Sequence, residues 1–201
     1  AALSASITGS ASSGTWSSSG SGSFNNNSLT AIYTPSSSDI NNGSVTLTYT
    51  TTNASAPCNN DSDSIVLTIN EEPIVNAGDD QTICSTDTAT LSASIAGSAS
   101  SGTWSSSGST GTINTINSPN AVYTPSSSDI NNGSVTLTFT TTDASAPCNN
   151  DSDSIVLTIN EEPIVNAGGD QIICSTDTAT LSASITGSAS SGTWSSSGST
   201  G

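Results

Sequence analysis

The 201-residue sequence contains no lysine, arginine, histidine or methionine, and its sixteen acidic residues give it a formal net charge of -16. Without cationic side chains the chain cannot neutralise phosphates or dock by charge on anionic lipid, which argues against nucleic-acid binding and membrane-surface binding. The usual catalytic constellations are missing too, because no basic side chain is present to activate a serine. Cations are the natural counter-partners of such a chain.

Long apolar stretches are also lacking. None approaches the roughly 20 residues of a membrane span, so we predict no membrane insertion. Hydrophobic residues make up 31% of the chain and charged residues only 8%, a charged fraction too low for the composition typical of disorder. The apolar residues moreover alternate with polar ones, as Val45, Leu47 and Tyr49 do with threonines. This pattern indicates a folded chain rich in β-strands.

A long internal repeat is the main positive feature. The string from Tyr33 to Thr110 recurs almost unchanged from Tyr123 to Thr200, so that Trp104 returns 90 positions later as Trp194. Self-similarity of this length is typical of whole small domains in series. Because any function of such an array has to survive being copied, the repeat favours a structural or adhesive role over a catalytic one.

Each repeat contains about seven short strand signals, separated by Gly, Ser and Asn. The clearest have apolar residues at every second position: Val45, Leu47 and Tyr49; Ile65, Leu67 and Ile69; Ala89, Leu91, Ala93 and Ile95. Only residues 34–43 and their repeat, residues 124–133, predict a helix; it is a single turn with Thr34 as N-cap, Pro35 as its first residue and Gly43 at its end. We therefore predict an all-β fold of tandem immunoglobulin-like antiparallel β-sandwiches, with Trp16, Trp104 and Trp194 at core positions.

The repeat also sets the predicted domain boundaries. Residues 1–72 form a partial repeat without its first strands, residues 73–162 form a complete repeat, and residues 163–201 form a partial repeat with first strands only. The connection between repeats is short and is stiffened by Pro73, so consecutive sandwiches should stack end to end as a semi-rigid rod. We interpret the sequence as a segment of a longer chain.

Three motifs carry a resemblance to a known family. They are the run from Pro73 to Cys84, the run Ser101-Gly-Thr-Trp-Ser105, and the run from Tyr123 to Ile130 followed by Gly133-Ser-Val-Thr-Leu-Thr. These motifs resemble the tandem immunoglobulin-like repeats, related to polycystic-kidney-disease-type domains, of large surface adhesins of Bacteroidota. The resemblance covers the whole chain. It implies secretion by the type IX route, an extracellular location at the cell surface, and a role in adhesion or gliding motility.

Paired acids are the remaining route to catalysis. Asp79 with Asp80 would supply the two carboxylates of a glycoside hydrolase, but Asp79 is replaced by Gly169 in the next copy. Such pairs on repeated loops are usually solvated. We predict that the chain is not an enzyme.

Calcium is the one cofactor that the sequence suggests. The ion takes six to eight oxygen ligands. The candidates are Glu71 and Glu72 in the connection between repeats, together with Asn149, Asn150, Asp151 and Asp153 before the last strand. In an immunoglobulin topology these two segments lie at the same pole. The alternative is that the acids only keep the chain soluble.

The resemblance also implies O-glycosylation at a short pattern of Asp, then Ser or Thr, then an apolar residue. The pattern occurs at four residues: Ser64, Thr88, Ser154 and Thr178. Since so short a motif arises readily by chance in a chain rich in Ser and Thr, chance is the alternative.

The four cysteines, Cys58, Cys84, Cys148 and Cys174, suggest oxidation, because an even number in a secreted chain is typical of disulfides. The strands between Cys58 and Cys84 run onward in one direction, which places these two too far apart to bond. A bridge within one domain would join Cys84 to Cys148. We favour a bridge between domains, since the topology places Cys84 at the pole nearer the following domain, where the counterpart of Cys148 would lie.

These observations predict a structural segment of a giant extracellular adhesin or surface filament that acts as a semi-rigid stalk. Its partners would be neighbouring repeats, other copies in a fibre, and surface glycans or abiotic surfaces. One alternative is a carbohydrate-binding adhesion module, which an exposed aromatic platform would favour. Another is a fibre subunit with true ends at Ala1 and Gly201, in which residues 163–201 of one molecule supply the missing first strands of another.

Overall fold

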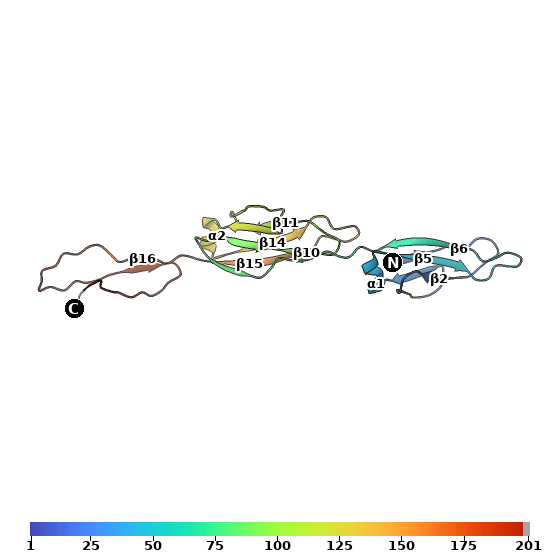
Figure 1. The fold of residues 1–201 in the computed structure, drawn as a ribbon, viewed down its shortest axis with the longest axis horizontal. Coiled ribbons are helices and arrows are strands. Elements are labelled where there is room, and N and C mark those ends of the chain that lie inside the picture. Colours follow the sequence, from blue (N-terminus) through green and yellow to red (C-terminus); the bar gives the residue numbers. More distant parts are fainter. Residues whose placement is uncertain (199–201) are drawn as a thin grey trace. The chain divides into compact units, whose positions relative to one another are not determined.

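The computed structural model describes residues 1–198, and nearly all of its regular structure is β-strand (Figure 1). The chain divides into two compact units: unit 1 comprises Ala1–Pro73 with Ala144–Asn149, and unit 2 comprises Ile74–Asp143 with Asn150–Gly201. No helix among the described residues is long and apolar enough to cross a membrane.

Unit 2 contains a complete sandwich. One sheet has the order β11-β14-β15-β8, a second has the order β12-β13-β9, and β7 pairs with β10. The bounds are β7 (Ile74–Asn76), β8 (Gln81–Cys84), β9 (Ala89–Ser92), β10 (Ser94–Ala96), β11 (Gly102–Ser107), β12 (Thr112–Ile113), β13 (Asn120–Thr124), α2 (Ser127–Asn132), β14 (Ser134–Thr141) and β15 (Ser152–Asn160). All of these pairs are antiparallel except β8 with β15, which is parallel. Two facing sheets of this order, with the edge strand β8 running beside the last strand, form an immunoglobulin-like sandwich, so the predicted fold class is confirmed.

The core of this sandwich follows from the alternation of apolar residues. Leu91, Leu137 and Leu157 are each 0% exposed, and Trp104 is 3% exposed. The Trp104 ring packs against Phe139, with ring centroids 5.1 Å apart. Full burial of each such side chain stabilises the fold by about 1.5–3 kcal/mol. Leu91 and Trp104, which the sequence predicts at core positions, are therefore buried, and so are Leu137 and Leu157, the counterparts of Leu47 and Leu67 in the next copy.

The helical turn begins two residues later than the sequence analysis predicts. In unit 1 the helix α1 spans Ser37–Asn42 and its N-cap is Ser36, not Thr34. Ser36 and Asp39 form a capping box in which each side chain accepts the other's backbone N–H, and this exchange satisfies two donors that Thr34 would leave unpaired. Gly43 ends the helix in the left-handed region at φ 70, as expected of a C-cap glycine.

Unit 1 has fewer strands. Its sheets have the orders β2-β5-β6 and β1-β4-β3. The bounds are β1 (Ala2–Ser4), β2 (Gly14–Ser18), β3 (Ser23–Phe24), β4 (Thr30–Thr34), β5 (Ser44–Thr51) and β6 (Ser62–Thr68). Among the described strands of this unit none corresponds to β7 or β8. As a result Ile65, predicted to face a core, is 48% exposed, whereas its counterpart Ile155 is 1% exposed.

Residues 163–198 form one strand pair, β16 (Ile164–Asn166) with β17 (Ser184–Thr186). Trp194 is 54% exposed, so its predicted core position is wrong. The reason is that the described part of the chain holds no strands beyond Trp194 that would cover it. The last three residues of the predicted partial repeat, 199–201, lie outside the described residues.

Candidate functional site

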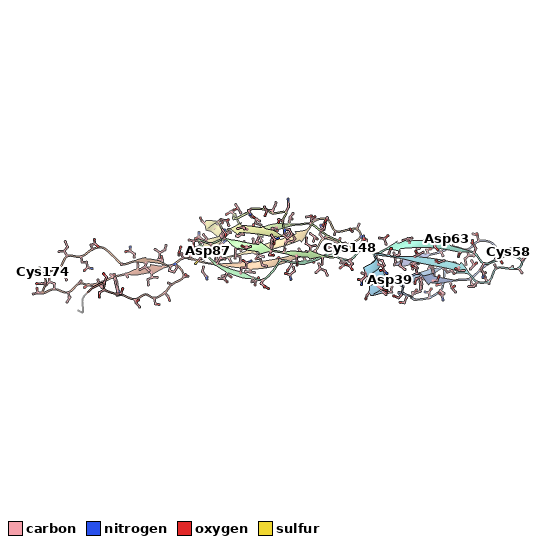
Figure 2. The ribbon with its side chains drawn as sticks, viewed as in Figure 1. Asp39, Cys58, Asp63, Asp87, Cys148 and Cys174 are labelled. Carbon is pink, nitrogen blue, oxygen red and sulfur yellow. The ribbon has the colours of Figure 1, made fainter. Side chains whose placement is uncertain are left out.

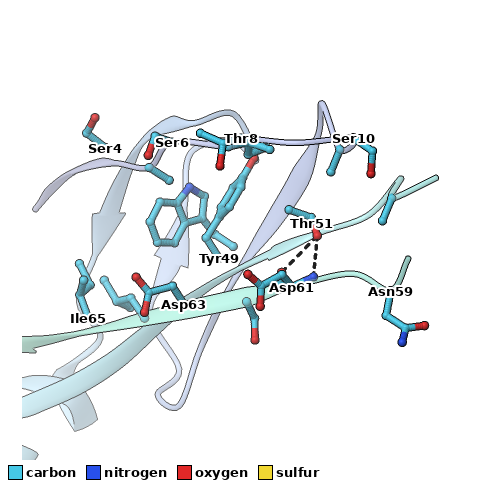
Figure 3. A pocket seen from close by; sticks show the side chains of 17 residues that line it. Ser4, Ser6, Thr8, Ser10, Tyr49, Thr51, Asn59, Asp61, Asp63 and Ile65 are labelled. Carbon is cyan, nitrogen blue, oxygen red and sulfur yellow. Dashed lines mark hydrogen bonds between the residues drawn. The ribbon is translucent and has the colours of Figure 1, made fainter. Parts of the chain in front are cut away.

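Unit 1 contains a groove with a volume of about 370 Å³ (Figure 3). Ser6 and Thr8 line one side, Asp61 and Asp63 line the other, and Tyr49 lies between them. The Thr51 hydroxyl donates to the Asp61 carbonyl oxygen at 3.2 Å and accepts the Asp61 N–H at 2.8 Å. These two hydrogen bonds fix the Asp61 side of the groove to β5.

In the complete sandwich of unit 2, β7 occupies the corresponding space between the counterparts of these residues. Val75 of this strand is 8% exposed and Ala77, just after it, is 1% exposed. Asp151 Oδ2 accepts the Val75 N–H, and Asp153 Oδ2 accepts the Ala77 N–H, each at 2.9 Å. These two predicted calcium ligands thus hold the first strand of the sandwich in place.

The other predicted calcium ligands are all exposed: Glu71, Glu72, Asn149 and Asn150. Within residues 1–198, no three or more Asp, Glu, His or Cys side chains are grouped in a way that would hold a metal ion. The backbone N–H of Ala77 is the main cause that lowers the Asp153 pKa. Calcium binding stays a prediction.

The four cysteines, all within the described residues, are free thiols. Figure 2 labels three of them, Cys58, Cys148 and Cys174. In unit 2, Cys84 is in register with Asn160 at the end of β15, whereas Cys148 precedes the first residue of that strand. A strand of this length separates its ends by roughly 30 Å at about 3.3 Å per residue, far beyond the reach of a disulfide within the repeat.

Cys148 belongs to the segment of unit 1 that comes from the β14–β15 loop. Its thiol donates to the backbone oxygen of Asn70 at 3.4 Å, and the Asn70 side chain donates to the Ala146 backbone oxygen at 2.7 Å. In unit 2 the residue equivalent to Asn70 is Asn160, whose backbone oxygen accepts the N–H of Ser85, the neighbour of Cys84. The Cys148 thiol thus contacts the carbonyl of Asn70, and the carbonyl of the equivalent Asn160 is bonded to the backbone of the residue next to Cys84.

Comparison with protein-family models finds no match, and no curated protein matches the sequence. Solved structures with a similar fold include the insect immune protein hemolin, at 13% identity and a TM-score of 0.41, covering 66% of this chain and 32% of that one. Mouse cadherin-23 EC22-24 has 10% identity and a TM-score of 0.43, covering 79% of this chain and 56% of that one. The chain thus spans less than two thirds of either structure. The immunoglobulin-like assignment rests on the strand order and pairing given above.

A buried polar pair lies beside the helical turn of each unit. In unit 2 the Tyr123 hydroxyl donates to Asp129 Oδ2 at 2.8 Å, and the Ser126 N–H donates to the same oxygen at 2.8 Å. Burial alone would raise the Asp129 pKa, but these hydrogen bonds and those of the Ser126 and Ser109 hydroxyls outweigh it and lower the pKa to about 2. Burial is the largest of the causes that shift the Tyr123 pKa, and it raises this pKa to about 12.

The sequence analysis missed this pair. The sequence feature that could have predicted the pair is the pattern Ser-x-x-Asp, which begins three residues after Tyr123. This pattern matches a capping box with Asp in place of Glu. The repeat of the same pattern at Tyr33 and Asp39 would have strengthened it.

The predicted glycosylation residues are all exposed: Ser64, Thr88, Ser154 and Thr178. The Ser64 and Ser154 hydroxyls each share a hydrogen bond of 2.8 Å with a threonine on the neighbouring strand, Thr48 and Thr138. Exposure makes these hydroxyls accessible to a transferase, and glycosylation stays a prediction.

Proposed function

We propose that the chain is part of a stalk of tandem immunoglobulin-like repeats in a large secreted surface adhesin of the Bacteroidota type. In this role the repeats transmit tension along the stalk and keep the adhesive part at a distance from the cell surface, and they catalyse no reaction. The near-identity of the copies supports the proposal, since a stalk needs many equivalent units and no unique site. The lack of every cationic side chain supports it as well, because it disfavours nucleic acids and anionic lipid as partners.

The observation that carries the proposal is the parallel pairing of β8 with β15. The two strands are in register from Gln81 with Leu157 to Cys84 with Asn160. A pull on the two ends of the repeat draws β8 toward its own start and β15 toward its own end. The strands must then slide past each other, so that the hydrogen bonds between them are loaded together. Such an arrangement suits a repeat that transmits tension.

The stalk proposal is tested with arrays of residues 73–162 joined by their own connection, in two, four and eight copies. If the short connection stacks the sandwiches end to end, the maximum dimension measured by small-angle X-ray scattering should grow in proportion to the number of copies. A dimension that grows much more slowly, as for a flexibly jointed chain, would contradict a semi-rigid stalk.

Calcium binding at the junction of repeats belongs to this proposal as an untested part. A ligand that binds only the folded state stabilises it by mass action. Thermal unfolding of the array in millimolar calcium should then occur at a higher temperature than in a chelator. Superimposable curves would leave the acids of the junction, which in this array are Glu161 and Glu162, the counterparts of Glu71 and Glu72, with a role in solubility alone.

A further inference from the structure

The repeat contains one cysteine at the end of β8 and one in the loop before β15. Cys84 is the first kind and Cys148 is the second, and their repeat counterparts are Cys174 and Cys58. Because Cys84 pairs with the end of β15 and Cys148 precedes its start, they are separated by roughly 30 Å, at about 3.3 Å per residue. A disulfide of the array therefore joins cysteines of different repeats.

The loop cysteine lies against the end of the last strand of the preceding repeat. Compact unit 1 includes the loop segment Ala144–Asn149. Within this unit the Cys148 thiol donates to the Asn70 backbone oxygen at 3.4 Å, and the Asn70 side chain donates to the Ala146 backbone oxygen at 2.7 Å. One asparagine thus holds the loop by two contacts and fixes the position of the thiol.

The strand cysteine lies beside the equivalent asparagine of its own repeat. Asn160 is the counterpart of Asn70, and it is the partner of Cys84 in the parallel pairing of β8 with β15. Neighbouring strands lie about 4.8 Å apart. The Asn160 backbone oxygen accepts the N–H of Ser85 at 2.8 Å, so the pairing continues past this position. The same asparagine position of the repeat therefore neighbours a strand cysteine in unit 2 and a loop cysteine in unit 1.

We propose that Cys84 of each repeat forms a disulfide with the counterpart of Cys148 in the following repeat. The proposal rests on the tandem stalk proposed above. The α-carbons of a disulfide are about 4.4–6.8 Å apart, which is the spacing of residues that neighbour one another across paired strands. Within residues 1–201 the repeat spacing of 90 positions gives each cysteine a partner position outside this range, and all four are free thiols.

The bond forms by thiol–disulfide exchange, with oxidised glutathione as the oxidant. The thiolate of one cysteine attacks the glutathione disulfide and releases one glutathione. The thiolate of the other cysteine then attacks the cysteine sulfur of the mixed disulfide and releases the second glutathione. Two cysteine thiols are oxidised to one disulfide, and one glutathione disulfide is reduced to two thiols that take up the two protons.

Successive bridges overlap along the chain and shorten the covalent path through the array. Each bridge ends at the loop cysteine of the next repeat, which comes after the strand cysteine that begins the next bridge. The shortest covalent path through two repeats is then about 27 residues, the runs 148–162 and 73–84, in place of about 180. A bridged stalk therefore lengthens only slightly even when its sandwiches unfold.

The first test maps the bond in a two-copy array of residues 73–162, the range that contains the complete sandwich of unit 2. After oxidation with glutathione disulfide, peptide mapping by mass spectrometry should find one bond, from Cys84 of the first copy to Cys148 of the second. Cys84→Ser in the first copy should abolish this bond. The same substitution in the second copy is the matched control and should retain it. A bond within one copy, or four free thiols after oxidation, would overturn the proposal.

The second test concerns the asparagine that positions the loop. Asn160→Ala in the first copy removes the side-chain donor equivalent to that of Asn70, so the bond should form several-fold more slowly. The same substitution in the second copy, whose Asn160 has no following loop to hold, should leave the rate unchanged. Equal rates for both variants would show that this side chain does not position the loop cysteine.

The closing experiment pulls a four-copy array from its ends before and after reduction. The reduced array should lengthen in four steps of roughly 300 Å, from about 90 residues at about 3.5 Å each. The oxidised array should lengthen in total by less than one such step, because the bridges bear the tension. Four full steps in both states would overturn the bridge and leave the stalk proposal intact. Gradual lengthening of the reduced array at low force would contradict the stalk proposal instead.

Discussion

At the scale of single residues, the hydroxyl of Tyr123 and the carboxylate of Asp129 form a buried polar contact that is expected to stabilise the fold. The hydroxyl and the carboxylate lie 2.8 Å apart, and the two side chains are 0% and 1% exposed. Tyr123→Phe removes the donor and leaves a buried carboxylate with one partner fewer. We expect the free energy of unfolding to fall by about 1.5–3 kcal/mol, measured by urea denaturation.

The control comes from the repeat itself. Tyr49 in the first copy is replaced by Phe139 in the second, so the sandwich accepts phenylalanine at this position. Tyr49→Phe should change stability by less than about 0.5 kcal/mol. An equally small effect of Tyr123→Phe would show that the contact with Asp129 contributes nothing.

The same pair predicts how stability depends on pH. The folded-state pKa of Asp129, about 2, lies below the ordinary 3.8, so its contribution is complete above about pH 4 and is lost as the pH falls toward 2. The pKa of Tyr123 is raised from 10.0 to about 12, so folding favours its neutral form and loses stability as the pH rises from 10 to 12. Melting temperatures should therefore show a plateau between about pH 4 and 10. A melting temperature that stays unchanged from pH 4 to pH 2 would contradict the assigned contacts.

At the scale of elements, the cap of α2 is the most local test. Ser126 accepts the Asp129 N–H at 3.2 Å and donates its hydroxyl to the Asp129 carboxylate. Ser126→Ala should cost about 0.5–2 kcal/mol of stability, and Ser126→Thr should recover most of it, since threonine is also a good N-cap. A threonine variant as unstable as the alanine variant would show that the position is sensitive to size and not to the hydroxyl.

The elements that the sequence predicted best are those in which local pattern and tertiary packing agree. The apolar residues that alternate around Leu137 and Leu157 are buried on one face of the sheet that contains β14 and β15, so these two strands lie where the pattern predicts them. The helix start was misplaced because Thr34-Pro35 and Ser36 are both acceptable caps locally, and only the burial of Asp39 decides between them. Aspartate is rarely buried, so composition gives no hint of that role.

The sequence also did not predict that the first strand of the repeat is divided into β7 and β8. β7 and β8 belong to different sheets, and β8 alone runs parallel to its neighbour. Residues 79 and 80 lie between them, and Asp80 Oδ1 accepts the Val156 N–H at 2.7 Å. A period of two predicts strands but not the sheet that each one joins, which is why the antiparallel expectation holds for every described pair of unit 2 but this one.

At the scale of the whole chain, the repeat explains both what unit 1 contains and what the C-terminal segment exposes. The repeat predicted that residues 1–72 lack first strands and that residues 163–201 carry them. It did not predict which residues would line the groove, because Asp61 and Asp63 look like solvated loop acids until β7 is seen bonded to their counterparts. Similarly, Trp194 has the sequence context of a core residue, but it is exposed because the described residues contain no strand after it that would cover it.

The stalk proposal depends on β8 and β15 resisting shear, and proline substitution in β8 tests this at single positions. Ser85 donates its N–H to the Asn160 backbone oxygen, and alternate residues of a strand face the same neighbour, so the Ile83 N–H also faces β15. Ile83→Pro removes a donor between the two strands. Thr82→Pro removes an N–H that faces away from β15 and is the matched control, with melting temperatures recorded for both variants.

The most direct measurement is the force at which a single repeat of residues 73–162 unfolds when it is pulled from its ends. The account predicts one abrupt event with a length gain of roughly 300 Å, from about 90 residues at about 3.5 Å each. Ile83→Pro should lower the unfolding force clearly more than Thr82→Pro does. Gradual lengthening of the parent repeat at low force, or equal forces for the parent and the Ile83 variant, would contradict the proposal that this strand pair resists tension.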